Sequence, residues 1–175
     1  MRLLYPLNLG FLISSTLRLN SNQLPYSCFS TFSRIEGESI RMFFEKTTLK
    51  ACVGASADRG KFGNKVLRCY IDNEMRVVPV NKRSKDIEGL QCVDSLETLV
   101  SQSGVIANEI GVSIITPPGV TKRILQSAYS LGIRHYFMQP GTYDNEVDKY
   151  IHDCMKEALV VKGCVLVELG WRDAR

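Results

Sequence analysis

The sequence predicts an α/β protein built on a mostly parallel sheet, and three observations lead to this fold class. From residue 47 onward, short apolar runs alternate with segments of helical periodicity. The apolar runs are continuous rather than alternating, as expected for strands that are covered on both faces. The helical segments are long enough for the right-handed crossovers that parallel strands require. Together these features predict a Rossmann-like, doubly wound sheet in a single domain, with a strand order of about 3-2-1-4-5-6.

The first strand, helix and second strand come from the clearest part of the pattern. Residues 48–54, "TLKACVG", form an apolar run that ends at a glycine and predict a buried strand. Residues 63–73, "GNKVLRCYIDN", carry apolar side chains at helical spacing and predict a helix that ends at "DN". Residues 76–80, "RVVPV", predict a second strand, whose proline suits the exit from a sheet better than its middle.

The middle of the chain contains a weaker strand, a short helix and a strong strand. Residues 87–93, "IEGLQCV", predict a turn with a short edge strand. Residues 95–103 begin with Ser95, a favourable N-cap residue, and predict a short helix. Residues 111–116, "GVSIIT", predict the third strong strand.

The last part repeats the alternation. Residues 117–132 open with two prolines and stop at a glycine, which is typical of a helix with both ends marked. Residues 133–138, "IRHYFM", predict a further strand, and residues 144–159 predict an amphipathic helix that Asp144 and Glu146 are expected to cap. Residues 160–169, "VVKGCVLVEL", are expected to close the sheet.

Composition places the chain among ordinary globular proteins. It has 175 residues, 45% of them hydrophobic and 23% charged, with a formal net charge of +4. No long Lys/Arg run or basic helix face indicates a nucleic-acid surface, and no segment is long and apolar enough to span a membrane. The chain is compatible with a homodimer. The six cysteines are far apart and include no CxxC pair, which favours reduced thiols over disulfides or zinc ligands: Cys28, Cys52, Cys69, Cys92, Cys154 and Cys164.

The N-terminal segment differs in composition from the rest. Its first 35 residues contain Arg2, Arg18 and Arg34 but no acidic residue, and Ser, Thr, Asn and Leu dominate. This composition predicts a transit peptide, so we expect residues 1–43 to form a largely disordered leader and the protein to reach the mitochondrial matrix. The alternatives are a secretory signal, or an unstructured leader with an internal start at Met42 that leaves the protein in the cytoplasm.

Four segments follow the strands, and in a doubly wound sheet the ligand lies at these carboxyl ends. The first, residues 54–63, has the spacing G-x5-G-x2-G, which is neither the dinucleotide motif G-x-G-x-x-G nor a phosphate-binding P-loop. It contains small residues that let the backbone approach a ligand, followed by the cations Arg59 and Lys61. It leads into a helix N-terminus, which favours an anion. The same loop could equally be a flexible turn with two solvated cations.

The segment after the second strand points to the kind of nucleotide. An NAD-binding site needs a carboxylate here to accept hydrogen bonds from the ribose hydroxyls. The chain instead has Asn81, Lys82 and Arg83. Two cations favour an adenosine with an additional phosphate on its ribose, as in NADP and coenzyme A. A charged surface turn is the alternative.

The motifs taken together resemble a known family. "VGAS…KFGNKV", "VVPVNKR…IEG…SLETL", "SIITPP" and "MQPGTYDNEV" are similar to the small CoA-binding-domain proteins, single Rossmann-like domains related to the CoA-binding domain of the succinyl-CoA synthetase α subunit. The resemblance spans about Phe44 to Gly170, within the predicted domain 44–175, and the "TPP" and "QPG" motifs resemble the eukaryotic branch.

The resemblance implies CoA or an acyl-CoA in the crevice. It assigns the first loop to the pantetheine-pyrophosphate path, Lys82 and Arg83 to the adenosine phosphate, the "TPP" residues to a wall, and the "QPG" residues to the floor near the thiol. The expected cofactor-binding residues are Gly54, Ala55, Ser56, Arg59, Lys61, Phe62, Gly63, Asn81, Lys82, Arg83, Thr116, Pro117, Pro118, Gln139 and Gly141.

No catalytic constellation is visible in the sequence. His135 and His152 are expected to be structural or solvated, Asp58 is expected to point away from bound phosphates, and no metal site is expected. We therefore expect a CoA-binding carrier, sensor or regulatory module rather than an enzyme. The alternatives are a small NADP-dependent oxidoreductase, for which Tyr143 lacks a suitably spaced Lys partner, and a scaffold subunit that keeps the fold without the ligand.

Overall fold

The protein is described here by a computed structural model, which defines residues 37–173. The predicted transit peptide lies almost wholly outside these residues. Residues 37–46 form a helix in which Phe43 is fully buried, packed edge-on against Phe137 of the sheet. Gly111 makes room for this ring, since a Cβ at residue 111 would lie 2.8 Å from the Phe43 side chain. Residues 37–43, which we expected to lack order, are therefore part of the packed domain.

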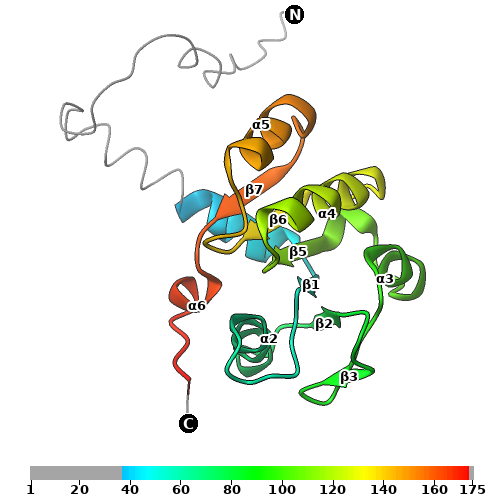
Figure 1. The fold of residues 1–175 in the computed structure, drawn as a ribbon, viewed down its shortest axis with the longest axis vertical. Helices are drawn as coiled ribbons and strands as arrows, with labels where there is room; N and C mark the ends of the chain where they lie inside the picture. Colours follow the sequence, from blue (N-terminus) through cyan, green and yellow to red (C-terminus); the bar gives the residue numbers. More distant parts are fainter. Residues whose placement is uncertain (1–36, 174–175) are drawn as a thin grey trace, which may run out of the picture. The chain divides into compact units, whose positions relative to one another are not determined.

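Five parallel strands form the central sheet (Figure 1). In spatial order they are β2 (Val77–Val80), β1 (Leu49–Val53), β5 (Ile110–Ile114), β6 (His135–Met138) and β7 (Leu159–Lys162). The order matches five of the six predicted positions. The chain moves from β1 to one side for β2 and to the other side for β5, so the strand order reverses between β1 and β5. Ligands bind in a doubly wound sheet at this reversal.

The predicted edge strand is reduced to a small hairpin. Strands β3 (Asp86–Ile87) and β4 (Leu90–Gln91) pair antiparallel in a separate two-stranded sheet, and a single parallel bridge, Val80 to Val93, connects this region to β2. The turn residues Glu88 and Gly89 both have positive φ, +50° and +75°. Two positive-φ residues are what a tight two-residue hairpin turn requires, so the segment folds back on itself instead of extending along β2.

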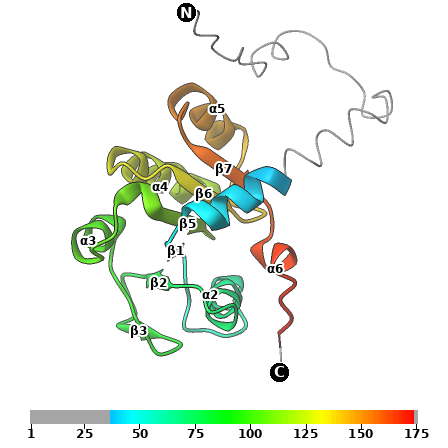
Figure 2. The same ribbon diagram turned by 180° about the vertical axis from the view of Figure 1, so that it is seen from behind.

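Helices cover both faces of the sheet (Figure 2). Helices α3 (Leu96–Gln102), α4 (Pro118–Ser130) and α5 (Asn145–Cys154) pack on one apolar core. The helix at 37–46, α2 (Phe62–Asp72) and α6 (Val165–Glu168) pack on the other. A short 3-10 helix (Ala107–Glu109) precedes β5. None of the helices in the described range is long and apolar enough to cross a bilayer.

The helix ends follow the expected capping chemistry. The Ser95 hydroxyl accepts a hydrogen bond from the Thr98 backbone N–H, and the Asp144 carboxylate accepts from the N–H groups of Glu146 and Val147. Pro118 occupies the first turn of α4, where its missing N–H costs nothing.

One predicted element at the C-terminal end is wrong. The last strand ends at Lys162 rather than continuing to residue 169, and α6 follows it. Gln139 begins this change of direction, because its side-chain Oε1 accepts a hydrogen bond of 3.1 Å from the backbone N–H of Val165. This bond engages the first N–H of α6, which therefore turns away from the sheet.

Candidate functional site

A cavity of about 940 Å³ opens at the carboxyl ends of β1, β2 and β5, beside the point where the strand order reverses. This volume lies within the range of small-molecule sites. Its apolar floor and walls come from strand ends and from the facing sides of α3 and α4. The lining residues are Val53, Gly54, Val80, Asn81, Lys82, Arg83, Asp94, Ser95, Leu96, Glu97, Thr116, Pro117, Val120, Arg123, Ile124 and Ser127.

Two glycines of the first loop allow its ends to meet. Gly54 has φ +96°, and a Cβ there would lie 3.3 Å from Thr116 Cγ2. A Cβ on Gly63 would lie only 2.1 Å from the carbonyl oxygen of Gly54. The first turn of α2 therefore packs directly on the end of β1, a contact that only glycine at residue 63 permits. The six residues between 56 and 61 are consequently displaced outward as a loop.

Asn81 holds the second loop against the first. Its side-chain Nδ2 donates to the carbonyl of Ala55 at 2.8 Å, and its Oδ1 accepts from the backbone N–H groups of Arg83 at 2.7 Å and Ser84 at 3.2 Å. With both ends of the amide engaged, Asn81 positions the Lys82–Arg83 turn at the mouth of the cavity. The side chain of Asn81 therefore holds the two loops together, and the residue also lines the cavity.

Three cations and two carboxylates line the same cavity. The side chains of Lys82, Arg83 and Arg123 are exposed, and within residues 37–173 none of them forms a hydrogen bond or a close ion pair. The cations therefore outnumber the carboxylates in this cavity. Two of them, Lys82 and Arg83, form the turn for which the sequence favours a phosphate on the ribose.

The two carboxylates are held in their ionised forms. Asp94 accepts a hydrogen bond of 2.6 Å from the Thr98 hydroxyl, and Glu97 accepts one from the Ser127 hydroxyl, which joins α3 to α4. These hydrogen bonds are the main reason why the pKa of each carboxyl lies below its usual value, and the charge of Lys82 lowers both further. Lys82 thus lies in the field of two acids.

The family assignment follows from the sequence of this same region. Residues 50–170 match the family described as "CoA binding domain". The chain belongs to this CoA-binding-domain family. The match begins at the second residue of β1 and spans every element from α2 through α6, so the cavity lies entirely within the family domain. No curated protein matches the sequence significantly.

Solved structures share the fold of this CoA-binding domain. A conserved hypothetical protein from Pyrococcus furiosus is 26% identical with a TM-score of 0.59, covering 70% of this chain and 98% of its own. A protein from Thermus thermophilus is 23% identical with a TM-score of 0.63, covering 75% and 95%. A hypothetical protein from Pyrococcus horikoshii is 21% identical with a TM-score of 0.62, covering 76% and 88%.

Of the predicted site residues, six line the cavity and nine do not. Those in the cavity are Gly54, Asn81, Lys82, Arg83, Thr116 and Pro117. Thr116 exchanges a side-chain hydrogen bond of 2.9 Å with Thr121, so its hydroxyl is already engaged within the start of α4. Pro118 is the first residue of that helix, immediately beyond the cavity wall.

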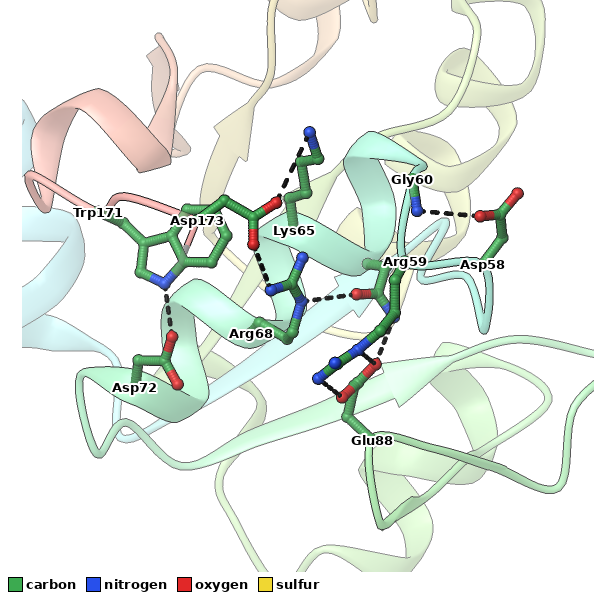
Figure 3. Close-up of polar contacts among 10 residues, drawn as sticks. Asp58, Arg59, Gly60, Lys65, Arg68, Asp72, Glu88, Trp171 and Asp173 are labelled. Atoms are coloured by element: carbon green, nitrogen blue, oxygen red, sulfur yellow. Dashed lines mark hydrogen bonds and ion pairs between the residues drawn. The ribbon is translucent and has the colours of Figure 1, made fainter. Parts of the chain in front are cut away.

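The rest of the first loop lies outside the cavity. Ala55 is buried, Ser56 is half-buried, and Lys61 and Phe62 are exposed at the start of α2. The guanidinium of Arg59 is already engaged, because it pairs with the carboxylate of Glu88 (Figure 3). Asp58 accepts a hydrogen bond of 2.9 Å from the backbone N–H of Gly60, which shapes the same loop.

The two "QPG" residues do not line the cavity either. Gln139 is fully buried and bonds to α6, and its Nε2 has no hydrogen-bond partner among residues 37–173. Gly141, with φ +85°, is exposed in the turn that follows. Neither residue lines the cavity that Lys82 and Arg83 line.

The walls that α3 and α4 supply were not among the residues predicted from the sequence. Val120, Arg123, Ile124 and Ser127 lie at positions i, i+3, i+4 and i+7 of α4, so helical periodicity counted from the "TPP" motif identifies this face. No such periodicity identifies residues 94–97 as a wall of the cavity. Their position depends on the bridge between Val80 and Val93, a contact that no local pattern encodes.

Other candidate chemistry lies elsewhere. His135 starts β6 at the opposite end of the strand, where burial lowers its pKa, and His152 is exposed on α5 beside Asp153. Neither lines the cavity. The five cysteines that the structure describes are free, and no group of three metal-ligating side chains occurs in residues 37–173.

The described residues fit a CoA ligand. An apolar cavity matches an adenine ring, and cations at its mouth match a phosphorylated ribose. Gly54 and Gly63 bring the backbone of β1 and α2 close together with no side chain between them.

Proposed function

We propose that this protein binds CoA or an acyl-CoA in the crevice at the carboxyl ends of its strands and serves as a carrier, sensor or regulatory module. The observation that carries the proposal is the cavity beside the reversal of strand order, apolar inside and bordered by Lys82, Arg83 and Arg123. Membership of the CoA-binding-domain family supports the choice of CoA among ligands with a phosphorylated ribose.

The residues divide into those that hold the base and those that hold phosphate. Val80, Leu96, Val120 and Ile124 supply apolar surface for an adenine ring. Lys82 and Arg83 supply charge for the phosphate on the ribose, and the Asn81 amide keeps their turn in place. Bound CoA supplies a thiol that carries acyl groups as thioesters. The residues of this cavity bind and orient the ligand, and none of them is assigned a step in a reaction.

Ligand-induced stabilisation tests this proposal. The full chain is heated with CoA, dephospho-CoA, NADPH or NADH, and the melting temperature is recorded. A ligand that binds only the native state adds roughly 2.7 kcal/mol at a hundredfold excess over its Kd. CoA should raise the melting temperature most. Stabilisation by NADPH but not by CoA would favour the oxidoreductase alternative. An unchanged melting temperature with all four ligands would favour a scaffold.

A double variant tests the adenosine end. Lys82→Ala with Arg83→Ala should weaken CoA binding and reduce the difference in affinity between CoA and dephospho-CoA, which lacks the ribose phosphate. The matched control is Lys85→Ala, a third exposed cation of the same connection that does not line the cavity. If the difference between the two ligands persisted in the double variant, the assignment of this end would be wrong.

We also propose that the protein acts in the mitochondrial matrix. The support is the Arg-containing, acid-free composition of residues 1–35. Fluorescent fusions of the full chain and of a chain that starts at Met42 test this. The full fusion should enter mitochondria and the short one should remain cytoplasmic, whereas identical distributions would contradict the proposal.

A further inference from the structure

Arg123 lies on the face of α4 that forms a wall of the cavity. It shares this face with Val120, Ile124 and Ser127, all of which line the same cavity. The neighbouring Lys122 does not line it, and its Nζ pairs instead with the Glu146 carboxylate at 3.4 Å. Two adjacent cations of one helix thus face different surroundings.

The charge of Arg123 has no partner in the folded domain. Within residues 37–173 its guanidinium forms neither a hydrogen bond nor a close ion pair. Arg59, Arg68 and Arg134, in contrast, each bond to a carboxylate or a carbonyl. A side chain that holds no part of the fold together is available to a ligand, and α4 fixes its backbone at the cavity.

The cations after β2 cannot neutralise a phosphate fully by themselves. The charge of Lys82 is shared with Asp94 and Glu97, since both carboxyls are held ionised and both respond to it. The two acids also repel an anion. A dianionic phosphate in this cavity therefore needs further positive charge. Arg123 is the one charged residue that α4 contributes to the lining, and its guanidinium offers the phosphate two parallel N–H donors.

We propose that Arg123 is a specificity-determining residue that binds the ribose phosphate of the ligand from α4, together with Arg83 from the turn after β2. The inference rests on the proposed function, since it concerns which residue distinguishes CoA from dephospho-CoA. It adds a contact from a residue of α4 that lies beyond the "TPP" motif.

Calorimetric titration of the full chain with CoA and with dephospho-CoA tests the inference. Arg123→Ala should weaken CoA binding by about tenfold, the lower end of what a hydrogen bond to a charged group contributes, and should leave the Kd for dephospho-CoA within about twofold. Arg123→Lys, which keeps the charge but not the planar fork, should restore part of the loss. Lys122→Ala is the matched control, one residue away on the same helix, and should change neither affinity.

The outcomes separate this inference from the proposed function. If Arg123→Ala weakened the binding of CoA and of dephospho-CoA equally, Arg123 would contact another part of the ligand and the inference would be overturned. An unchanged CoA affinity would also overturn it. In either case CoA binding by the wild-type chain would still stand. A wild-type chain that binds neither ligand would overturn the proposed function and the inference with it.

Discussion

The guanidinium of Arg59 donates two hydrogen bonds to the carboxylate of Glu88, from Nε to Oε1 at 3.0 Å and from Nη2 to Oε2 at 2.9 Å. Glu88 stands at the turn of the β3–β4 hairpin, and Asn64 of α2 also donates to it at 2.8 Å. Both bonds lower the pKa of the Glu88 carboxyl, with Arg59 the larger cause. Figure 3 shows how this pair joins the loop after β1 to the hairpin. The cation that the sequence assigned to phosphate is therefore already paired.

Removing the Glu88 charge should release Arg59 toward the ligand. Glu88→Gln keeps the size of the side chain but ends the ion pair, so CoA should bind several-fold more tightly if Arg59 contacts a phosphate. The free energy of unfolding should fall by less than about 1 kcal/mol, because the Arg59 side chain is exposed and solvent screens the pair. Titration calorimetry and urea denaturation measure the two effects.

The control for this variant is Glu157→Gln, which removes an acid paired with Arg134 at the other end of the sheet. It should leave CoA affinity unchanged. An unchanged affinity in Glu88→Gln as well would mean that Arg59 serves only to hold the loop to the hairpin.

Gly63→Ala should destabilise the domain and weaken CoA binding together. The new methyl group would overlap the Gly54 carbonyl, and neither backbone can yield without moving α2 from the end of β1. Overpacking of this kind costs about 1–3 kcal/mol. Gly119→Ala is the control, since nothing lies within 4 Å of its new Cβ and a helical alanine is favourable. Equal stability of the two variants in urea would contradict the close contact.

The buried Lys50 should make the free energy of unfolding depend on pH. It is buried beneath Phe43 and Phe44, and burial lowers its pKa to about 8 from about 10.5. Between these values the unfolded chain holds a proton that the native state has lost, so the Lys50 contribution to stability increases as pH rises from 8 to 10.5. Lys50→Met should therefore be more stable than the wild type by roughly 1–2 kcal/mol at pH 7.

The free energy of unfolding is measured against pH for the wild type and for Lys50→Met. The difference between the two proteins isolates Lys50 from the other groups that titrate above pH 8. The advantage of Lys50→Met should be constant below pH 8 and shrink steadily up to pH 10.5. Urea denaturation at several pH values measures it. A difference that stays constant through pH 10.5 would mean that Lys50 keeps its ordinary pKa in the native state.

The single tryptophan reports on the C-terminal segment. Trp171 Nε1 donates to Asp72 Oδ2 at 2.6 Å, and the Arg68 guanidinium lies 5.1 Å from the ring centroid (Figure 3). Asp72→Ala removes the acceptor, so the ring should become more exposed and its fluorescence should shift to longer wavelengths. Asp58→Ala, an acid of the first loop with no contact to Trp171, should leave the spectrum unchanged. An unshifted spectrum in Asp72→Ala would show that Arg68 alone holds the ring.

Local patterns predicted most of the fold correctly. The strands β1, β2, β5 and β6 and the helices α2 to α5 all follow from apolar runs, periodicity and caps such as Ser95 and Asp144. The errors lie where a distant contact decides. Phe43 orders a helix that the leader composition did not suggest, because it packs on Phe137. Gln139 caps a helix where the apolar run predicted a strand.

The order of amino acids determined by itself the doubly wound class, the loops at the strand ends and the turn with two cations after the second strand. These depend on short-range chemistry, on side-chain periodicity and on glycine and proline. Only the tertiary structure decided which cations share one cavity, because that depends on groups far apart in the chain. It paired Arg59 with Glu88, joined Glu97 to Ser127, and placed Arg123 in the same cavity as Lys82 and Arg83.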